Sequence, residues 1–410
     1  MAAHRWCLVV TAALSSTGCG ARTAPEERWV AELHPDADAV APADGDTVDA
    51  TLDPRLIRGV QLVVGGSSAC VLRQQGDVFC WGMSWPGTPV PSPRRVPGAE
   101  GIIEIDTSYF GASTCGTTAR GEVFCWGRQS APFGAQREPP SESAVRIEGL
   151  APARYVRTGL VNFALHADGR VSCWGYERAA ACGPDAGAVP YRVFVPVPAG
   201  VVELDAGAFA CARTDRGEVW CWGDNRDGIT GTGASAAELR VPLRVPLPFA
   251  ADRIVVRDEL GCAFAAGRVP HCWGWNYTWP GTDRELRSPQ RVPVAVPQFS
   301  ALREASSGYP WCFVDESGTA RCWGFNGSDC VIASPSDTPP DRYIRTPTAI
   351  RELGTVRSVA VGAHAACALR RDDSVWCWGE NAHGELGNGV LDVLGPEGYP
   401  CHFPPAPVRY

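Results

Sequence analysis

The tripeptide Cys-Trp-Gly recurs seven times along this chain, at intervals of 45 to 55 residues. Its tryptophans are Trp81, Trp126, Trp174, Trp222, Trp273, Trp323 and Trp378. A repeat of this length is typical of propeller blades or of a solenoid, in which each unit buries its apolar surface against its neighbours. The chain has 410 residues, which is too long for one ordinary core and fits a repeat array.

Each repeat has the pattern of three or four short strands. An alternating apolar segment such as residues 356–362 comes first, a second strand leads to a tight turn, and a third strand ends in Cys-Trp-Gly. A loop and a Pro-x-x-Val-like segment, such as residues 242–245, then lead to the next repeat. We therefore expect an all-β fold, a seven-bladed β-propeller over residues 52–410, with the repeated tryptophans in its core.

Cysteine spacing predicts a disulfide in six of the seven blades. In these repeats a cysteine lies ten residues before the cysteine of Cys-Trp-Gly. In five repeats a glycine just past the midpoint suits the left-handed third residue of a hairpin loop, and this register places the two cysteines within disulfide reach. The expected pairs are Cys70–Cys80, Cys115–Cys125, Cys211–Cys221, Cys262–Cys272, Cys312–Cys322 and Cys367–Cys377. Reduced, packed cysteines are the alternative.

The exceptions to this pattern carry their own expectations. Phe163 replaces the first cysteine of the third repeat, so Cys173 is expected to pair with the nearby Cys182, and Cys330 with Cys401 between blades 6 and 7. In the fifth repeat Gly267 comes one residue early and Pro270 replaces the usual valine, which predicts a distorted hairpin.

The two ends of the array suggest how the ring closes. The first repeat has no clear Pro-x-x-Val segment before Val60, whereas the chain ends with one at residues 405–409. We expect this last strand to complete the first blade and so to remove an open sheet edge.

The seventh repeat is the best preserved. Residues 367–387 read Cys-Ala-Leu-Arg-Arg-Asp-Asp-Ser-Val-Trp-Cys-Trp-Gly-Glu-Asn-Ala-His-Gly-Glu-Leu-Gly, with Gly362 and His364 upstream. This sequence closely resembles the repeat of the regulator-of-chromosome-condensation family, and the fourth repeat keeps part of it. The resemblance implies a seven-bladed propeller. The family's functions include nucleotide exchange on a small nuclear GTPase, scaffolding and, in secreted bacterial members, inhibition of a β-lactamase, so the fold does not fix the function.

The N-terminus predicts export. Residues 1–19 have a short basic start, an apolar run and small residues before Cys19, as in a signal peptide. The segment resembles a bacterial lipoprotein signal that would lipidate Cys19, although Ser16 stands where that signal usually carries leucine. An ordinary signal peptide is the alternative. Residues 20–51, rich in Ala, Pro, Asp and Glu, predict a flexible acidic tether. We expect an outer-membrane or cell-surface lipoprotein, or otherwise a periplasmic or secreted protein.

Charge and motifs exclude several functions. The net charge is −8 and the basic residues form no run, so nucleic-acid binding is not expected. We find no nucleophile, zinc-protease or phosphate-loop motif, and residues 224–228 lack the oxygen ligand that a calcium loop needs at Arg226. We expect a monomer that is not an enzyme, has no cofactor or metal, and meets the membrane only through a lipid anchor.

Aromatic residues in the loops after Trp-Gly are the candidate binding residues: Trp85, Tyr176, Trp275, Tyr277, Trp279 and Phe325. If these loops emerge on one face, they form a patch of the kind that binds proteins or glycans; packing on neighbouring loops is the alternative. The sequence therefore predicts a non-enzymatic binding module or scaffold. An inhibitor of a secreted enzyme such as a β-lactamase, and an extracellular hydrolase or lyase, are the alternative functions.

Overall fold

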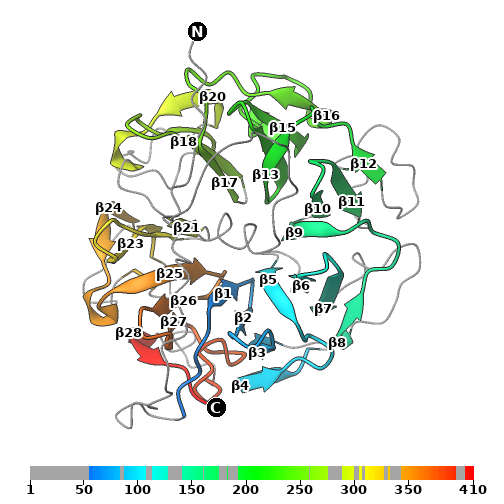
Figure 1. Cartoon of the computed structure of the whole chain (residues 1–410). Helices are drawn as coiled ribbons and strands as arrows, with labels where there is room; N and C mark the ends of the chain where they lie inside the picture. Colours follow the sequence, from blue (N-terminus) through cyan, green and yellow to red (C-terminus); the bar gives the residue numbers. More distant parts are fainter. Residues whose placement is uncertain are drawn as a thin grey trace, which may run out of the picture. The chain divides into compact units, whose positions relative to one another are not determined.

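The propeller is seen in a computed structural model, which describes residues 55–83, 87–107, 113–127, 141–159, 161–174, 182, 193–257, 259–275, 289–299, 304–306, 310–326, 331–332, 343–393 and 402–410. These residues all fall in one compact unit, Val48–Tyr410. They form seven four-stranded antiparallel sheets arranged as the blades of a ring (Figure 1). The predicted all-β, seven-bladed propeller is confirmed.

Each blade is continuous in sequence. Blade 1 contains β1 (Gln61–Val64), β2 (Ser68–Leu72), β3 (Val78–Met83) and β4 (Pro89–Arg95). Blade 2 contains β5 (Ile102–Thr107), β6 (Ser113–Thr118), β7 (Val123–Gly127) and β8 (Ser141–Arg146). Blade 3 contains β9 (Ala153–Thr158), β10 (Asn162–His166), β11 (Val171–Trp174) and β12 (Val193–Val195). Blade 4 contains β13 (Val201–Ala206), β14 (Phe209–Thr214), β15 (Val219–Asp224) and β16 (Glu238–Arg244).

The remaining blades follow the same order. Blade 5 contains β17 (Arg253–Arg257), β18 (Leu260–Phe264), β19 (His271–Gly274) and β20 (Gln290–Ala295). Blade 6 contains β21 (Glu304–Ser306), β22 (Trp311–Val314), β23 (Ala320–Phe325) and β24 (Tyr343–Ala349). Blade 7 contains β25 (Val356–Val361), β26 (Ala365–Arg370), β27 (Val375–Gly379) and β28 (His402–Pro407). Short 3-10 turns are η2 (Arg226–Gly228), η4 (Pro297–Phe299) and η6 (Arg351–Leu353).

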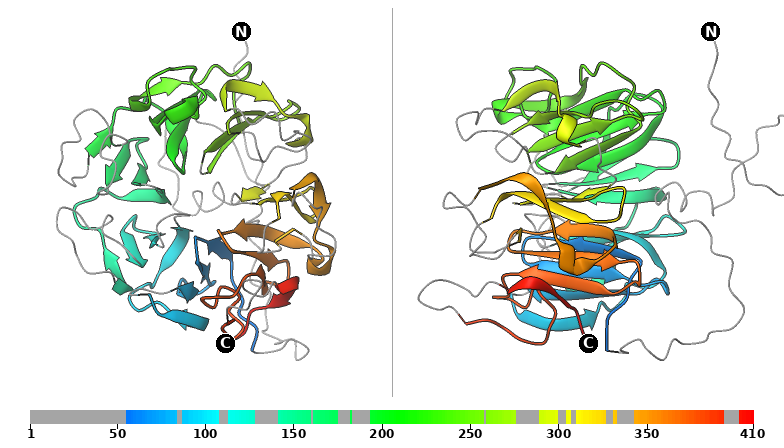
Figure 2. Two further views of the ribbon diagram at one scale, coloured as in Figure 1. Left: turned by 180° about the vertical axis from the view of Figure 1, so that it is seen from behind. Right: turned by 90° about the vertical axis from the view of Figure 1, so that its left-hand side faces the viewer.

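The up-and-down order of the strands gives the propeller two different ends. The first strand of each blade lies nearest the ring axis and the fourth lies at the rim (Figure 1). Turns between strands 1 and 2 and loops between strands 3 and 4 therefore emerge at one end, which we call the loop face. Hairpins between strands 2 and 3 and the links between blades emerge at the other end, the hairpin face. The strands run between these two ends in the edge-on view of Figure 2.

The repeated tryptophans hold neighbouring blades together. All seven are buried, which confirms their predicted place in the core. Trp126 of blade 2 packs with Val78 and Val96 of blade 1, and Trp81 of blade 1 packs with Val375 and Leu386 of blade 7. Each Cys-Trp-Gly thus supplies a large apolar contact to the preceding blade. Among the described residues, no helix is long and apolar enough to cross a membrane.

The hairpins adopt the geometry that the glycine spacing predicts. Gly76, Gly121, Gly169, Gly217 and Gly318 all have left-handed φ values between 74° and 81°. In blade 7 Asp373 takes this position with φ 64°. In blade 5 Gly267 takes it one residue early, and strand pairing stops at Ala263 and His271 because Pro270 cannot donate a ladder hydrogen bond. The distortion predicted for this hairpin is present.

The opposed cysteines are bonded. The six pairs with ten-residue spacing form disulfides, with Cα atoms 4.0–4.1 Å apart. In blade 3 Phe163 stands opposite Cys173, and Cys173 bonds to Cys182 instead. The Phe163 ring packs edge-on against Trp222 of the next blade, so it keeps the apolar contact that the cysteine gives up. Cys330 and Cys401 lie outside the described residues.

The expected route of ring closure is wrong. β28 pairs with β27 and completes blade 7, and blade 1 has all four strands within residues 61–95. Each Pro-x-x-Val segment is the outer strand of the blade that contains the preceding Cys-Trp-Gly. Blade 1 therefore needs no such segment before Val60. The ring closes through residues 55–59, which form bridges from Leu56 to Arg409 and from Arg58 to Ser374. Tyr410 then reaches blade 1, where its ring meets Phe79 and its hydroxyl accepts a hydrogen bond from Arg73.

Candidate functional site: the loop face

The loop face collects the segments that follow each third strand. Two of the predicted binding aromatics are described: Trp275 directly follows β19 and Phe325 ends β23, so strand order places both at this end of the propeller. The loops of blades 4 and 7 are described nearly throughout, as residues 225–237 and 380–393. We call them the blade-4 loop and the blade-7 loop.

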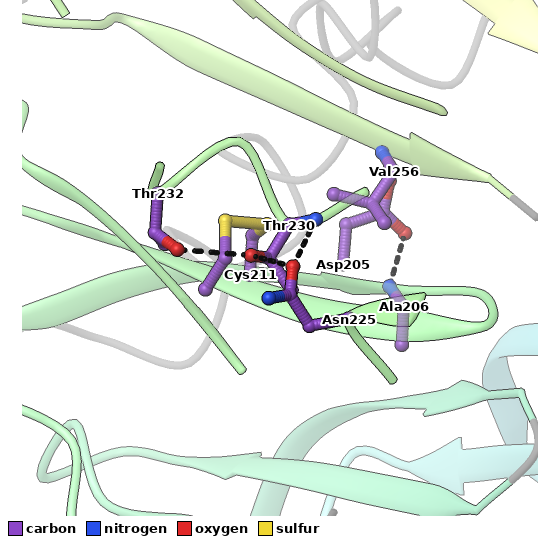
Figure 3. The surroundings of a disulfide bond; sticks show 8 residues. Asp205, Ala206, Cys211, Asn225, Thr230, Thr232 and Val256 are labelled. Carbon is purple, nitrogen blue, oxygen red and sulfur yellow. Dashed lines mark hydrogen bonds between the residues drawn. A yellow bond between two sulfur atoms is a disulfide. The ribbon is translucent and has the colours of Figure 1, made fainter. Parts of the chain in front are cut away.

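A buried asparagine organises the blade-4 loop. Asn225 accepts hydrogen bonds from the N–H (3.2 Å) and hydroxyl (2.6 Å) of Thr230. Its amide nitrogen donates to the carbonyl oxygens of Ala234 (3.1 Å) and Ala236 (2.6 Å), so one side chain ties both arms of the loop. Figure 3 shows the contact of Asn225 with Thr230. This loop folds as a turn, in agreement with its rejection as a calcium loop.

Asparagines at the same place do the same in two further blades. Asn381 accepts from the N–H of Leu386 (3.0 Å) and donates to the carbonyl oxygen of Val390 (2.9 Å). Asn326 in blade 6 accepts from the N–H of Ile332 (2.9 Å). All three side chains are buried. Sequence reasoning missed Asn326, although its place two residues after Cys-Trp-Gly was a readable signal.

Each of these loops covers the tryptophan of the next blade. The indole N–H of Trp378 donates to the backbone carbonyl oxygen of Val331 (2.7 Å). The indole N–H of Trp81 donates to the backbone carbonyl oxygen of Glu385 (2.8 Å). A Cβ on Gly231 would stand 2.3 Å from the Trp273 ring, so only glycine permits this close approach. The blade-7 loop, folded over Trp81, therefore also helps to close the ring.

The blade-7 loop presents three apolar side chains to solvent. Val390 is 56% exposed, Leu391 41% and Val393 83%; we call them the apolar patch. Their backbone is held on both sides, because Gly389 N–H donates to the carbonyl oxygen of Pro91 (2.8 Å) and Asp392 N–H to that of Asn381 (3.1 Å). The patch is thus a fixed feature of the surface.

The predicted aromatic residues are only partly within the described structure. Trp275 is half-buried and packs on the core between blades 4 and 5. Phe325, at the end of β23, is 36% exposed. Trp85, Tyr176, Tyr277 and Trp279 lie outside the described residues, as does Cys19. The aromatic patch as a group therefore stays a prediction.

Three histidines beside the blade-7 loop each contact a buried carboxylate. His383 Nδ1 lies 2.9 Å from Glu385, and His402 Nε2 lies 2.7 Å from Asp392. His364 Nδ1 lies 3.3 Å from Glu380. The His364–Glu380 and His402–Asp392 pairs bind the loop to its own blade, and the His383–Glu385 pair lies within the loop. Across the described part of the chain, no group of three or more His, Cys, Asp or Glu side chains could hold a metal ion.

Side chains near the ring axis satisfy the free edge of four inner strands, β5, β9, β13 and β17. That edge has no strand neighbour, so its N–H groups need other partners. Ile105 N–H donates to Gln61 of the preceding blade (2.8 Å), Leu204 N–H to Tyr155 (2.7 Å) and Ile254 N–H to Glu203 (3.2 Å). Thr158 N–H donates to Asp106 in the same way, and Val256 N–H donates to Asp205 (Figure 3).

The charged side chains among these inner-edge contacts are paired with one another. Arg157 of blade 3 donates to Glu104 of blade 2 and lies 3.6 Å from Asp205 of blade 4. Burial raises the pKa of the Glu104 carboxyl, and Arg157 opposes that shift. Burial also raises the pKa of Glu203, against the nearby Arg213. These carboxylates already bind a backbone N–H or an arginine of the next blade. Their perturbed pKa values therefore follow from a structural role between blades and do not indicate a catalytic site.

Comparisons with known proteins agree with this geometry. A family model described as the regulator of chromosome condensation (RCC1) repeat matches residues 60–84, 207–229 and 356–385, in blades 1, 4 and 7. The crystal structure of human WBSCR16 is 18% identical, with a TM-score of 0.63 over 78% of this chain and 85% of that one. The crystal structure of Kap60 bound to yeast RCC1 (Prp20) contains a chain that is 18% identical, with a TM-score of 0.68 over 90% of this chain and 91% of that one. No curated protein matches in sequence.

Fold and loop face together define a disulfide-bonded seven-bladed β-propeller with structured loops at one end. Within that class, blades 1, 4 and 7 contain the segments that match the RCC1-repeat model. Its seven described disulfides indicate an oxidising, extracellular type of environment.

Proposed function

We propose that this protein is a non-enzymatic binding module of the cell surface or periplasm that recognises a protein partner through its loop face. The apolar patch carries the proposal. Three solvent-exposed apolar side chains within four residues are unusual on a protein that binds nothing, whereas single ones are common.

The fixed backbone of the patch suits it to binding. Asn381, Asn388 and the carbonyl oxygen of Pro91 hold residues 389–392 by hydrogen bonds. A partner would therefore meet an ordered surface, and little conformational entropy would be lost when the complex forms. Phe325 and the accessible part of Trp275 belong to the same face, and with Trp85, Tyr176, Tyr277 and Trp279 they complete the proposed contact region.

The compartment in this proposal rests on the disulfides and on the N-terminus. Disulfides persist in oxidising compartments, and residues 1–19 have the features of an export signal. We propose lipidation at Cys19, with residues 20–51 as the tether. A protein partner also fits the likeness to yeast RCC1, whose crystal structure was solved with Kap60 bound.

Affinity capture with matched surface variants tests the proposal. The bait is the full chain carrying Val390→Ser, Leu391→Ser and Val393→Ser, used beside the unchanged chain on envelope and secreted proteins of the source organism. The control carries Val241→Ser, Leu243→Ser and Val292→Ser, which are 49%, 39% and 46% exposed on the outer strands of blades 4 and 5.

We expect a protein that the unchanged chain and the control capture and that the patch variant loses, with at least a tenfold fall in affinity, since truncated anchor residues at interfaces cost 1 kcal/mol or more each, roughly. Equal capture by all three chains would move the binding site away from the blade-7 loop. Capture of a glycan in place of a protein would change the class of ligand.

A further inference from the structure

The chain enters and leaves the propeller at one place on the hairpin face. Arg55 is the first described residue, and its carbonyl oxygen accepts from Tyr410 N–H (3.0 Å). Residues 56–59 then run between the C-terminal strand and the β26–β27 hairpin, where Gly59 N–H donates to Asp373 (3.0 Å). The chain that precedes residue 55 therefore joins the propeller at the seam between blades 7 and 1.

Arginine side chains concentrate at this seam. We call the hairpin-face surface of blades 7 and 1 the seam face. Its arginines are Arg55, Arg58, Arg73, Arg94, Arg95, Arg351, Arg357, Arg370, Arg371 and Arg409. Its carboxylates are Asp77, Glu100, Glu352, Asp372 and Asp373. The seam face thus has ten arginines and five carboxylates, in a chain whose net charge is −8.

Backbone contacts bring these arginines together from both ends of the sequence. Arg371 N–H donates to Thr355 (3.4 Å), next to Arg357, and Arg58 pairs with Ser374. Arg73 reaches Tyr410, the neighbour of Arg409. By contrast, the hairpins of blades 2 to 4 mix the two signs: Arg120 with Glu122, Asp168 with Arg170, and Asp215 and Glu218 with Arg216. These three hairpins therefore carry no such excess of positive charge.

Part of this charge is neutralised within the protein and part is presented to solvent. Arg73 and Arg95 both approach Asp77, and Arg357 pairs with Asp373 (2.8 Å). Arg94, Arg351 and Arg371 are exposed. Guanidinium groups bind phosphate by two parallel hydrogen bonds, so exposed arginines on one face suit a phosphate-bearing surface.

We infer that the seam face docks on an anionic phospholipid bilayer. The chain that precedes residue 55 enters the propeller on this face, and the exposed arginines there supply the positive charge that an anionic bilayer attracts. The apolar patch lies at the opposite end, on the loop face. A docked propeller therefore presents its binding surface away from the membrane. This inference does not depend on the identity of the loop-face partner.

Vesicle sedimentation tests the inference. The full chain carries Cys19→Ser, so that no acyl chain contributes, and is mixed with vesicles of phosphatidylcholine containing phosphatidylglycerol or of phosphatidylcholine alone. The test variant adds Arg94→Ser, Arg351→Ser and Arg371→Ser. The control adds Arg120→Ser, Arg216→Ser and Arg268→Ser, which removes the same charge from exposed hairpin-face positions of blades 2, 4 and 5.

We expect binding to the anionic vesicles only, with a fall as salt is raised toward 1 M, roughly, where the Debye length is about 3 Å. Each arginine near an anionic surface contributes about a fivefold gain in partitioning, so the test variant should bind about a hundredfold more weakly and the control much less so. Absence of vesicle binding by the unchanged chain, or an equal loss in both variants, would overturn the inference.

Discussion

Removing residues 408–410 should open the ring, and the structure lets the cost be worked out. Val408 is fully buried among Ile57, Trp81 and Leu386, a burial worth about 1.5–3 kcal/mol. Four backbone hydrogen bonds are lost: Ile57 N–H to Val408, Val408 N–H to Val375, Arg409 N–H to Gly387 and Tyr410 N–H to Arg55, at about 0.5–1.5 kcal/mol each. The Tyr410–Phe79 ring contact adds about 0.5–1.5 kcal/mol. Together the loss is about 4–10 kcal/mol.

Urea unfolding with the disulfides intact, followed by tryptophan fluorescence, measures this loss. At a slope of about 3 kcal/mol/M the midpoint of urea unfolding should fall by about 1.5–3 M. Val408→Ala and Val245→Ala form the matched pair, because Val245 is equally buried and donates to Val219 as Val408 does to Val375. Each should cost about 2 kcal/mol. A truncation no worse than Val408→Ala would refute the role of the C-terminal residues in closing the ring.

Four further predictions concern the loops, the inner-edge contacts, the hairpins and the disulfides. Asn381→Ala should cost about 1–3 kcal/mol by thermal unfolding and speed hydrogen exchange in residues 386–392, because buried backbone groups lose their partner. Arg157→Leu should cost about 3–5 kcal/mol of folding stability at neutral pH, because it leaves the buried Glu104 carboxylate without its partner. Since burial raises the pKa of Glu104, protonation of that carboxyl should restore part of the lost stability as pH falls. A loss that does not change with pH would count against a stabilising Arg157–Glu104 pair. Burial works to raise the pKa of Asp315, but hydrogen bonds from Ser317 and Arg321 outweigh it and hold that pKa at about 2. Its contribution is present above the ordinary value of 3.8 and is lost as pH falls toward 2, so Asp315→Asn should remove about 1 kcal/mol, after solvent screening, at pH 7 and little near pH 2. Replacing both Cys211 and Cys221 by alanine should cost about 2–4 kcal/mol in urea and leave the other blades folded.

The fold could be predicted because its constraints are local and repeat. Spacing between Cys-Trp-Gly motifs sets the blade length. A separation of ten residues between two cysteines sets the hairpin register in which they stand opposite each other, as Cys211 and Cys221 do. Glycine at the tip needs the left-handed region, as Gly217 shows. The hairpin features depend on residues less than a dozen positions apart, and the blade length depends on a regular repeat, so no knowledge of tertiary contacts was needed.

Ring closure could not be predicted, because a period does not say where a blade begins. The Pro-x-x-Val segment lies between two Cys-Trp-Gly motifs and fits either neighbour equally well in the sequence. Strand pairing decides it: Leu243 of β16 pairs with Cys221, upstream of it in the chain. The seam then depends on contacts between residues 55–59 and 373–410, which no local pattern signals.

The candidate surfaces also arise from contacts distant in sequence. The apolar patch is exposed because Asn381 and Pro91, far apart in the chain, hold its backbone, whereas sequence reasoning weighed only aromatic residues. The seam arginines do not form a basic run in the sequence, because they come from residues 55–95 and 351–409. They share one face only when the ring closes. Trp275 resembled an exposed anchor in the sequence, and in the structure it is half-buried, because part of it packs against the core between blades 4 and 5.

Hydrogen-exchange footprinting of the protein with its captured partner tests the central claim most directly. Amides in the described loop-face segments are compared in the free and bound protein, with the hairpins of blades 2 to 4 as the internal reference. We predict slower exchange on binding in residues 386–393 and around Phe325, with no change in the reference hairpins. Protection confined to the hairpin face or to the outer strands, with residues 386–393 unchanged, would contradict the assignment of the loop face as the binding surface.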